Sequence, residues 1–203
     1  MEKIKLSIIY YSSTGTNYQL AQWAKEEAEV NGAEVRLRKV KELAPAFAIE
    51  KNPAWKRHYD ATQDVEEASS DDIIWADALL FSSPSRFGTM PSQMKQFLDL
   101  QGGLWANGKI VNKVVSAMTS AQNPHGGQEA TLLSFYTSMM HWGTIIVTPG
   151  YTDPVLYGAG GNPYGTSVSV SQDGKMQEDV EGAVRHQVTR TLDVAARIVN
   201  GEN

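Results

Sequence analysis

Short runs of apolar residues alternate with longer amphipathic segments along most of the chain. The short runs are typical of buried β-strands, and the longer segments repeat their apolar positions at helical spacing. The predicted strands are Ile4–Tyr10, Glu34–Val40, Ala78–Ser82, Lys113–Met118 and Thr144–Val147. The predicted helices are Tyr18–Gly32, Ser70–Ala76, Pro91–Leu100, Gln128–His141 and Glu178–Asn200. This alternation predicts an α/β fold with a parallel sheet covered by helices on both faces.

The spacing of these elements predicts a single domain over residues 1–203. A doubly wound sheet of five parallel strands would place them in the flavodoxin-like order 2-1-3-4-5. Two connectors, at about 43–69 and 148–177, are longer than usual. Long connectors in compact domains often serve as lids or assembly elements.

Composition narrows the class of protein. Hydrophobic residues make up 41% of the chain and charged residues 20%, which is enough for a substantial core. The net charge of -5 argues against a nucleic-acid surface, which needs clustered Lys and Arg. The absence of cysteine excludes disulfides, Cys-ligated metal and thiol catalysis. No signal-peptide pattern or membrane-spanning apolar run is visible, so we expect a cytoplasmic protein with no membrane insertion.

A hydroxyl-rich turn follows the first strand and leads directly into a helix. Its residues are Ser12, Ser13, Thr14, Gly15, Thr16 and Asn17. Free N–H groups at a helix N-terminus bind phosphate, and hydroxyl groups add donors without charge. The turn matches neither the Walker pattern nor the dinucleotide fingerprint. It suits a phosphate monoester such as that of FMN, and the alternative is an ordinary turn with Thr16 or Asn17 as helix N-cap.

Two further loops follow the third and fourth strands, which would neighbour the first. One loop contains Pro84, Ser85, Arg86, Phe87 and Gly88, and the other contains Ser120, Ala121, Gln122, Asn123, Gly126 and Gly127. Ligands bind at the carboxyl ends of such strands, so the three loops would form one cleft. Turn backbone suits the polar edge of a flavin, and glycine permits close approach. The alternatives are a surface ion pair for Arg86 and core packing for Phe87.

Other candidates are weaker on their own. His141 ends a helix, where it would complement the dipole or bond a carbonyl in the cleft. Trp105 would form a stacking wall or pack in a core or interface. His58 and His125 lack partners at metal-ligand spacing, so we expect no metal site.

Several motifs follow one another in a specific order along the chain. They are Tyr11-Ser12-Ser13-Thr14-Gly15, Ser83-Pro84-Ser85-Arg86-Phe87-Gly88, Gly102-Gly103-Leu104-Trp105, Gly126-Gly127-Gln128-Glu129, His141, Pro149-Gly150-Tyr151 and Gly161-Asn162-Pro163-Tyr164-Gly165. Together they resemble the flavodoxin-like NAD(P)H:quinone oxidoreductases historically called tryptophan-repressor-binding proteins (WrbA). The resemblance runs from about Lys3 to the last helix.

This resemblance implies one noncovalent FMN per subunit, NAD(P)H as co-substrate, and a homotetramer with active sites near subunit contacts. It implies that residues 12–17 hold the FMN phosphate and that residues 85–87 line the isoalloxazine. It also implies that residues 120–123 with Gly126 and Gly127 close the other side. Trp105, His141 and Tyr151 would border the nicotinamide or quinone pocket as catalytic residues, and His141 would also contact the cofactor.

The implied reaction is two-electron reduction of quinones to hydroquinones, by a ping-pong hydride relay through FMN N5. The chain departs from the family at Thr14, where an aromatic residue is common, and at Trp142, where a second histidine can occur. The loop Ala121–His125 is slightly longer than usual. The alternatives are a one-electron carrier, a non-catalytic interaction protein, or an FMN-dependent azo- or nitroreductase.

Overall fold

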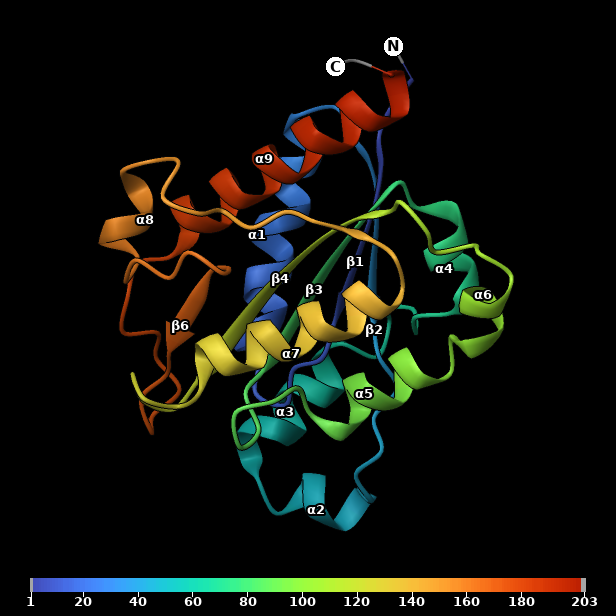
Figure 1. The fold of residues 1–203 in the computed structure, drawn as a ribbon. Helices are drawn as coiled ribbons and strands as arrows, with labels where there is room; N and C mark the ends of the chain where they lie inside the picture. The colour runs from blue at the N-terminus through green and yellow to red at the C-terminus, as the bar shows by residue number, and fades with distance from the viewer. Residues whose placement is uncertain (1, 202–203) are drawn as a thin grey trace.

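A parallel sheet forms the centre of the computed structural model, which describes residues 2–201 (Figure 1). Five strands lie in the order β2-β1-β3-β4-β5, as the sequence predicts. They are β1 (Lys5–Tyr10), β2 (Glu34–Lys39), β3 (Ala78–Pro84), β4 (Val114–Ala121) and β5 (Ile145–Ile146). A further strand, β6 (Ser167–Ser169), also pairs with β4.

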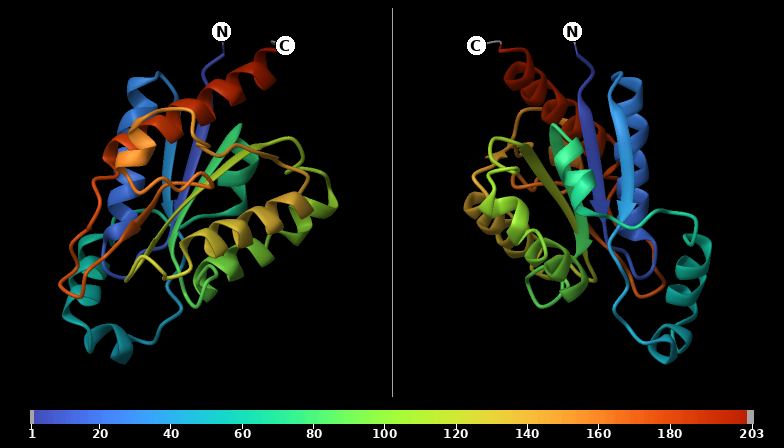
Figure 2. Two further views of the ribbon diagram at one scale, coloured as in Figure 1. Left: turned by 60° about the vertical axis from the view of Figure 1, so that its left-hand side comes forward. Right: turned by 90° about the vertical axis from the view of Figure 1, so that its right-hand side faces the viewer.

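Helices cover both faces of this sheet (Figure 2). On one face lie α1 (Thr16–Val30) and α9 (Glu181–Asn200), and on the other lie α4 (Ser70–Trp75), α5 (Ser92–Asp99) and α7 (Gln128–His141). Successive side chains of a strand point to opposite faces. Accordingly, Ile8 and Tyr10 of β1 join the core under α1 and α9, whereas Ile9 joins the core on the other side.

The fifth strand position is divided between two short segments. β5 pairs with the start of β4 at Val114–Val115, and β6 pairs with its end at Thr119–Ala121. The chain between them leaves the sheet and forms α8 (Val155–Gly158). The predicted long connector at 148–177 therefore contains one helix and one strand. The prediction of five strands missed β6, because three residues carry too little pattern to identify a strand.

The other long connector, at 43–69, also contains structure that the sequence analysis missed. It forms α2 (Ala46–Glu50) and α3 (Pro53–Ala61), which lie beyond the carboxyl end of β2 (Figure 2, right). Asn52 caps α3, since its Oδ1 accepts hydrogen bonds from the N–H groups of Ala54 (3.1 Å) and Trp55 (3.2 Å). Proline at the first helical position adds to this start signal.

Strands β3 and β4 extend further than predicted. Pro84 pairs with Ser120 and Ser83 with Thr119, so residues expected in loops belong to the sheet. Their hydroxyl-rich sequence hid the strands, because buried serine and threonine do not look apolar. The structure also adds α6 (Gly102–Ala106), which carries Trp105. Within residues 2–201, no helix has the length and apolar character to cross a membrane.

Candidate functional site

The turn between β1 and α1 presents a helix N-terminus without a side-chain cap. Gly15 is the N-cap residue, with a φ of 104°, and α1 begins at Thr16. The alternative that Thr16 or Asn17 caps the helix is therefore wrong. The Ser12 hydroxyl accepts the Gly15 N–H at 3.0 Å and shapes the turn. The first N–H groups of the helix have no partner within it, so they can bind an anion.

Asn17 connects this turn to the two neighbouring strands. Its Nδ2 donates to Ser82 Oγ at 3.1 Å, and its Oδ1 accepts from the Ser120 hydroxyl at 2.6 Å. The Ser82 hydroxyl in turn donates to the Asn17 carbonyl at 3.2 Å. All three side chains are buried. The side chains of Asn17 and Ser120 thus bond within the protein, which leaves the Asn17 N–H as the group available to a ligand.

The three loops meet at the carboxyl edge of the sheet. Arg86 Nη2 donates to Ser13 Oγ at 3.2 Å, which joins the second loop to the turn. The Ser85 hydroxyl donates to the Gly126 carbonyl at 2.7 Å, and the Ser85 N–H donates to the Ser120 carbonyl, also at 2.7 Å. These bonds tie the second loop to the third. The structure therefore brings the three loops into one arrangement.

Glycine is required where the second and third loops touch. Gly127 has a φ of 81°, and a Cβ added there would lie 2.7 Å from the Gly88 Cα. At Gly126 a Cβ would lie 2.3 Å from the Ala121 Cβ. A side chain at Gly127 would push the two loops apart, and a side chain at Gly126 would clash within the third loop. Because the two loops approach so closely, main-chain atoms rather than side chains line the site at this point.

Two side chains of the second loop remain exposed at this edge. Phe87 is fully exposed and has a φ of 54°, in the left-handed region that aromatic residues rarely adopt. Arg86 is also exposed, and its guanidinium bonds Ser13 and the Ser85 carbonyl (3.2 Å) rather than a carboxylate. Neither the ion pair nor the core packing considered as alternatives is present among the described residues. Exposure and backbone strain together favour a functional role for this loop.

Burial raises the pKa of Tyr11, which lies at the end of β1 beside the turn, and the nearby Glu42 carboxylate raises it further. Arg86 acts in the opposite direction, with a smaller effect. Tyr11 therefore stays protonated and donates its hydroxyl proton to Glu42 Oε2 at 3.0 Å.

Two of the predicted catalytic residues, Trp105 and His141, lie together away from this cleft, and the third, Tyr151, packs elsewhere on another tyrosine. Trp105 Nε1 donates to the His141 carbonyl at 2.9 Å. His141 ends α7, whose 14 residues place it about 20 Å along the helix from the third loop. Tyr151 instead stacks on Tyr157, with ring centroids 5.4 Å apart. In Figure 1, α8 with Tyr157 and α6 with Trp105 lie on opposite sides of the molecule.

His58, which the sequence excludes only as a metal ligand, lies beside the turn. His58 of α3 lies next to Gly15, with its Nδ1 3.6 Å from the place a Gly15 Cβ would take, and its ring packs on Tyr18 at 5.5 Å. Burial, together with Lys39, lowers the pKa of His58. The Asn52-Pro53 pair is the sequence signal that could have located this helix.

Known proteins resemble this chain over most of its length. The profile of the family described as NADPH-dependent FMN reductase matches residues 4–152. A protein of Deinococcus radiodurans named NAD(P)H dehydrogenase (quinone) is 50% identical over 196 residues, covering 97% of this chain and 98% of the relative. A protein of the same name from Geotalea uraniireducens is 38% identical over 205 residues, with 96% and 99% covered.

Solved structures support the fold. A flavodoxin, WrbA-like protein from Agrobacterium tumefaciens superposes with a TM-score of 0.66 at 19% identity, covering 96% of this chain and 99% of that one. The NAD(P)H:(acceptor) oxidoreductase FerB from Paracoccus denitrificans gives 0.58 at 13% identity, with 96% and 98% covered. At these identities the likeness concerns the fold alone.

Proposed function

The chain belongs to the NADPH-dependent FMN reductase family, and we propose that it is an FMN-dependent NAD(P)H:quinone oxidoreductase of the WrbA type. The observation that carries the proposal is the joined set of three loops around an uncapped helix N-terminus. Full-length similarity to proteins named NAD(P)H dehydrogenase (quinone) supports the choice of acceptor. We propose the cytoplasm as its location, where NAD(P)H is available.

The residues of the cleft fit FMN chemically. The N–H groups at the start of α1 and the hydroxyls of the turn would hold the phosphate, since no acidic side chain lies in the first helical turn. Ser85, Arg86 and Phe87 would line one side of the ring, and Gly126 and Gly127 the other. When bound, FMN supplies the two-electron chemistry that joins NAD(P)H oxidation to quinone reduction.

Arg86 is the cation of the cleft. Its hydrogen bonds to Ser13 Oγ and the Ser85 carbonyl fix the guanidinium between two loops before any ligand arrives. A preorganised cation stabilises negative charge that develops on a reacting ring. Arg86→Ala should therefore weaken FMN retention or slow its reduction. Full occupancy and unchanged rates in this variant would remove Arg86 from the mechanism.

Trp105 and His141 would act on the cleft of a neighbouring copy, and Tyr151 would border the same nicotinamide or quinone pocket. This follows from the distance along α7, because one chain cannot bring its own Trp105 and His141 to its own turn. A homotetramer with active sites near subunit contacts would satisfy this requirement. The exposed indole of Trp105 supports such a role. It would form a wall for the nicotinamide or quinone, and His141 would position the quinone oxygen.

The first test is anaerobic stopped-flow of the FMN-loaded protein, mixed with NADPH and then with benzoquinone. We expect fast bleaching of the flavin absorbance by NADPH and fast recovery with quinone. Persistent yellow flavin after NADPH would favour an electron carrier. Failure to bind FMN would favour a non-catalytic interaction protein.

Subunit sharing can be tested by complementation. Gly127→Val should disable the cleft, and Trp105→Ala should disable the wall. If neighbouring copies share each site, mixed oligomers of the two variants regain activity that neither variant has alone. Equal inactivity before and after mixing, with mixed assembly shown by native mass spectrometry, would contradict the proposal.

A further inference from the structure

A cavity of about 180 Å³ adjoins the phosphate turn on the side of β2 and α3. We call it the α3 cavity. It is lined by Tyr10 of β1 and Ser12 of the turn, by Lys39 of β2 and Lys41 just beyond it, and by Trp55 and His58 of α3, among others. Because Ser12 belongs to both the turn and the cavity, a ligand of the cleft can extend into it.

Aromatic side chains form much of the wall of the α3 cavity. Trp55, His58 and Tyr59 come from α3, Tyr10 ends β1, and Tyr11 follows it. The Trp55 indole is fixed, since its Nε1 donates to Glu42 Oε2 at 3.2 Å. A cavity of about 150 Å³ holds benzene, so this one accommodates a flat ring. Such a wall favours a planar, aromatic ligand.

Glu42, one of the two carboxylates that line the α3 cavity, already has hydrogen-bond partners within the protein. Glu42 accepts hydrogen bonds from Tyr11 Oη (3.0 Å), Trp55 Nε1 and Gln93 Nε2 (2.8 Å), and from the N–H groups of Leu43 and Ala44 (both 2.9 Å). These hydrogen bonds stabilise the carboxylate charge within the protein, and they hold the rim of the α3 cavity in place.

The two lysines at the rim, Lys39 and Lys41, have few partners within the protein. Lys41 is exposed and forms no ion pair with any residue from 2 to 201. Lys39 Nζ donates to the Thr62 carbonyl at 2.6 Å, which engages one of its three protons. Glu67 also lines the cavity, and it is exposed to solvent, which screens it. The rim can therefore take a phosphate group.

Tyr10 supplies an independent observation. The side chain is 1% exposed, and its hydroxyl has no hydrogen-bond partner within the described residues. Buried hydroxyls almost always have a partner, so an orphaned one beside a cavity indicates a missing group. Burial, together with Tyr18, raises the pKa of Tyr10, so the hydroxyl is present as a donor.

We propose that the α3 cavity binds the adenosine end of NAD(P)H, with the adenine ring among the aromatic side chains and the ribose phosphates near Lys39 and Lys41. This rests on the proposed function, because it names the binding site for the remote half of the co-substrate. The neutral His58 ring contributes a stacking surface. The lysines favour the additional 2′-phosphate and hence NADPH over NADH.

The direct test is calorimetric titration of the FMN-loaded protein with 2′,5′-ADP, a probe that carries no nicotinamide. We expect binding that weakens about tenfold in Lys41→Gln and is lost in Trp55→Ala. Lys109→Gln, an exposed lysine outside the cavity, is the matched control and should bind as the wild type does. Unchanged binding in both cavity variants, or no binding by the wild type, would overturn the proposal.

A kinetic comparison separates the cavity from the reaction. Reduced nicotinamide mononucleotide lacks the adenosine half, so Lys41→Gln should raise the KM for NADPH several-fold and leave the KM for the mononucleotide unchanged. Equal KM increases for both donors would overturn the cavity assignment. Binding of 2′,5′-ADP without any NADPH oxidation would support the cavity and refute the proposed function.

Discussion

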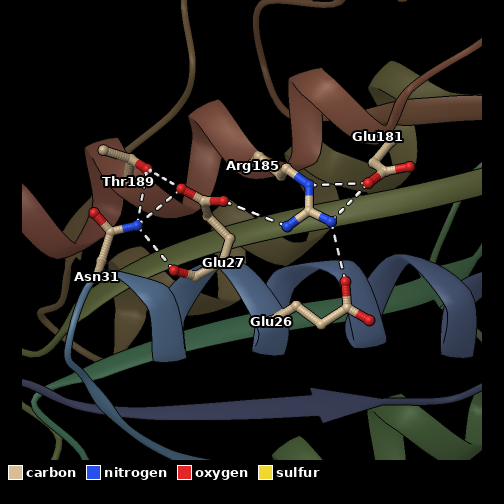
Figure 3. A network of polar contacts seen from close by, with 6 residues as sticks. All are labelled: Glu26, Glu27, Asn31, Glu181, Arg185 and Thr189. Atoms are coloured by element: carbon tan, nitrogen blue, oxygen red, sulfur yellow. Dashed lines mark hydrogen bonds and ion pairs between the residues drawn. The ribbon is translucent and has the colours of Figure 1, made fainter.

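Helix α1 carries an asparagine near each end, and the two have opposite surroundings. Asn17, in the first turn, is buried and bonds the hydroxyls of Ser82 and Ser120. Asn31, at the C-cap, is exposed and bonds Glu27 and, at 3.4 Å, Thr189 of α9 (Figure 3). The first network joins three segments that build the cleft. The second network only connects α1 with α9. The hydrogen bonds of Asn17 therefore shape the site, whereas those of Asn31 link two helices at the surface.

The two networks should also differ in how much they contribute to the free energy of unfolding. A buried donor or acceptor left without its partner costs about 1–3 kcal/mol, whereas exposed ion pairs contribute about 0–1 kcal/mol. The exposed network includes Arg185, which bonds Glu26 (3.0 Å), Glu27 (3.4 Å) and Glu181 (2.6 Å) (Figure 3). It contains more charges and more bonds than the buried one. We nevertheless expect it to contribute less stability.

Asn17→Ala should have the largest effect. The substitution leaves the buried Ser120 hydroxyl without its acceptor and removes the donor to Ser82 Oγ, while Ser82 keeps its bond to the residue-17 carbonyl. We therefore expect a loss of about 2–4 kcal/mol in the free energy of unfolding. FMN affinity should also fall, because the turn loses its link to β3 and β4. Urea denaturation and fluorescence titration with FMN measure the two effects. A loss below 1 kcal/mol would show that burial does not make the Asn17 network more stabilising than the surface network.

Asp72→Asn tests a site that is both buried and charged. Asp72 accepts from the Ser69 N–H and hydroxyl (both 2.9 Å) and pairs with Arg36 (3.3 Å) and Arg38 (3.0 Å). Burial opposes ionisation, but the bonds from Ser69 and Arg38 outweigh it and lower the pKa of Asp72. We expect a loss of about 1–3 kcal/mol at neutral pH.

The pH dependence of this loss follows from the direction of the shift. A lowered folded-state pKa gives stability that is complete above the usual aspartate value of about 4 and is lost as pH falls through the folded value. The difference between wild type and Asp72→Asn should therefore shrink at acid pH. Thermal melts from pH 7 to pH 2.5 measure it. A constant difference would rule out this linkage.

Arg185→Ala should cost about 0.5–1 kcal/mol, despite the three carboxylates around the guanidinium. These bonds raise the pKa of Arg185, with the one to Glu181 foremost, but the side chains remain partly exposed to solvent. Salt should reduce the effect further, because it screens exposed charges. Urea denaturation at low and at 1 M NaCl tests this. An effect as large as that of Asn17→Ala would contradict the expected difference in stability between the buried network and the surface network.

Asn31→Ala should have the smallest effect, about 0.5 kcal/mol or less, with no change in FMN affinity. It is the matched control for Asn17→Ala, since the residue type and helix are the same. A measurable loss of FMN affinity here would show that the two ends of α1 are coupled.

The sheet and the loops were predictable because each depends on local pattern. Apolar runs such as that ending at Tyr10 identify strands, and strand order then assigns Ser12, Arg86 and Gly127 to one edge. The partners of Asn17 were not predictable. They lie 65 and 103 residues away, and no periodicity connects an asparagine to two distant serines.

The α3 region was missed for a different reason. None of the nine residues of α3 is fully buried, so the helix lacks the apolar stripe on which sequence reasoning relies. Its position comes from the Asn52 cap and from contacts such as His58 against Tyr18. The placement of Trp105 and His141 away from the cleft could not be predicted from the sequence either, because it depends on the length and direction of α7.

The divided fifth strand position bears on how the protein behaves at high concentration. An open sheet edge can pair with a strand from another molecule, and segments of six or seven residues suffice for ordered aggregates. Here the outer edge of β4 meets only two residues of β5 and three of β6. In the gap between them, Gln187 Nε2 of α9 donates to Ser116 Oγ (2.7 Å) and to the Ala117 carbonyl (2.9 Å). The longest strand of the sheet therefore offers no continuous template for intermolecular pairing.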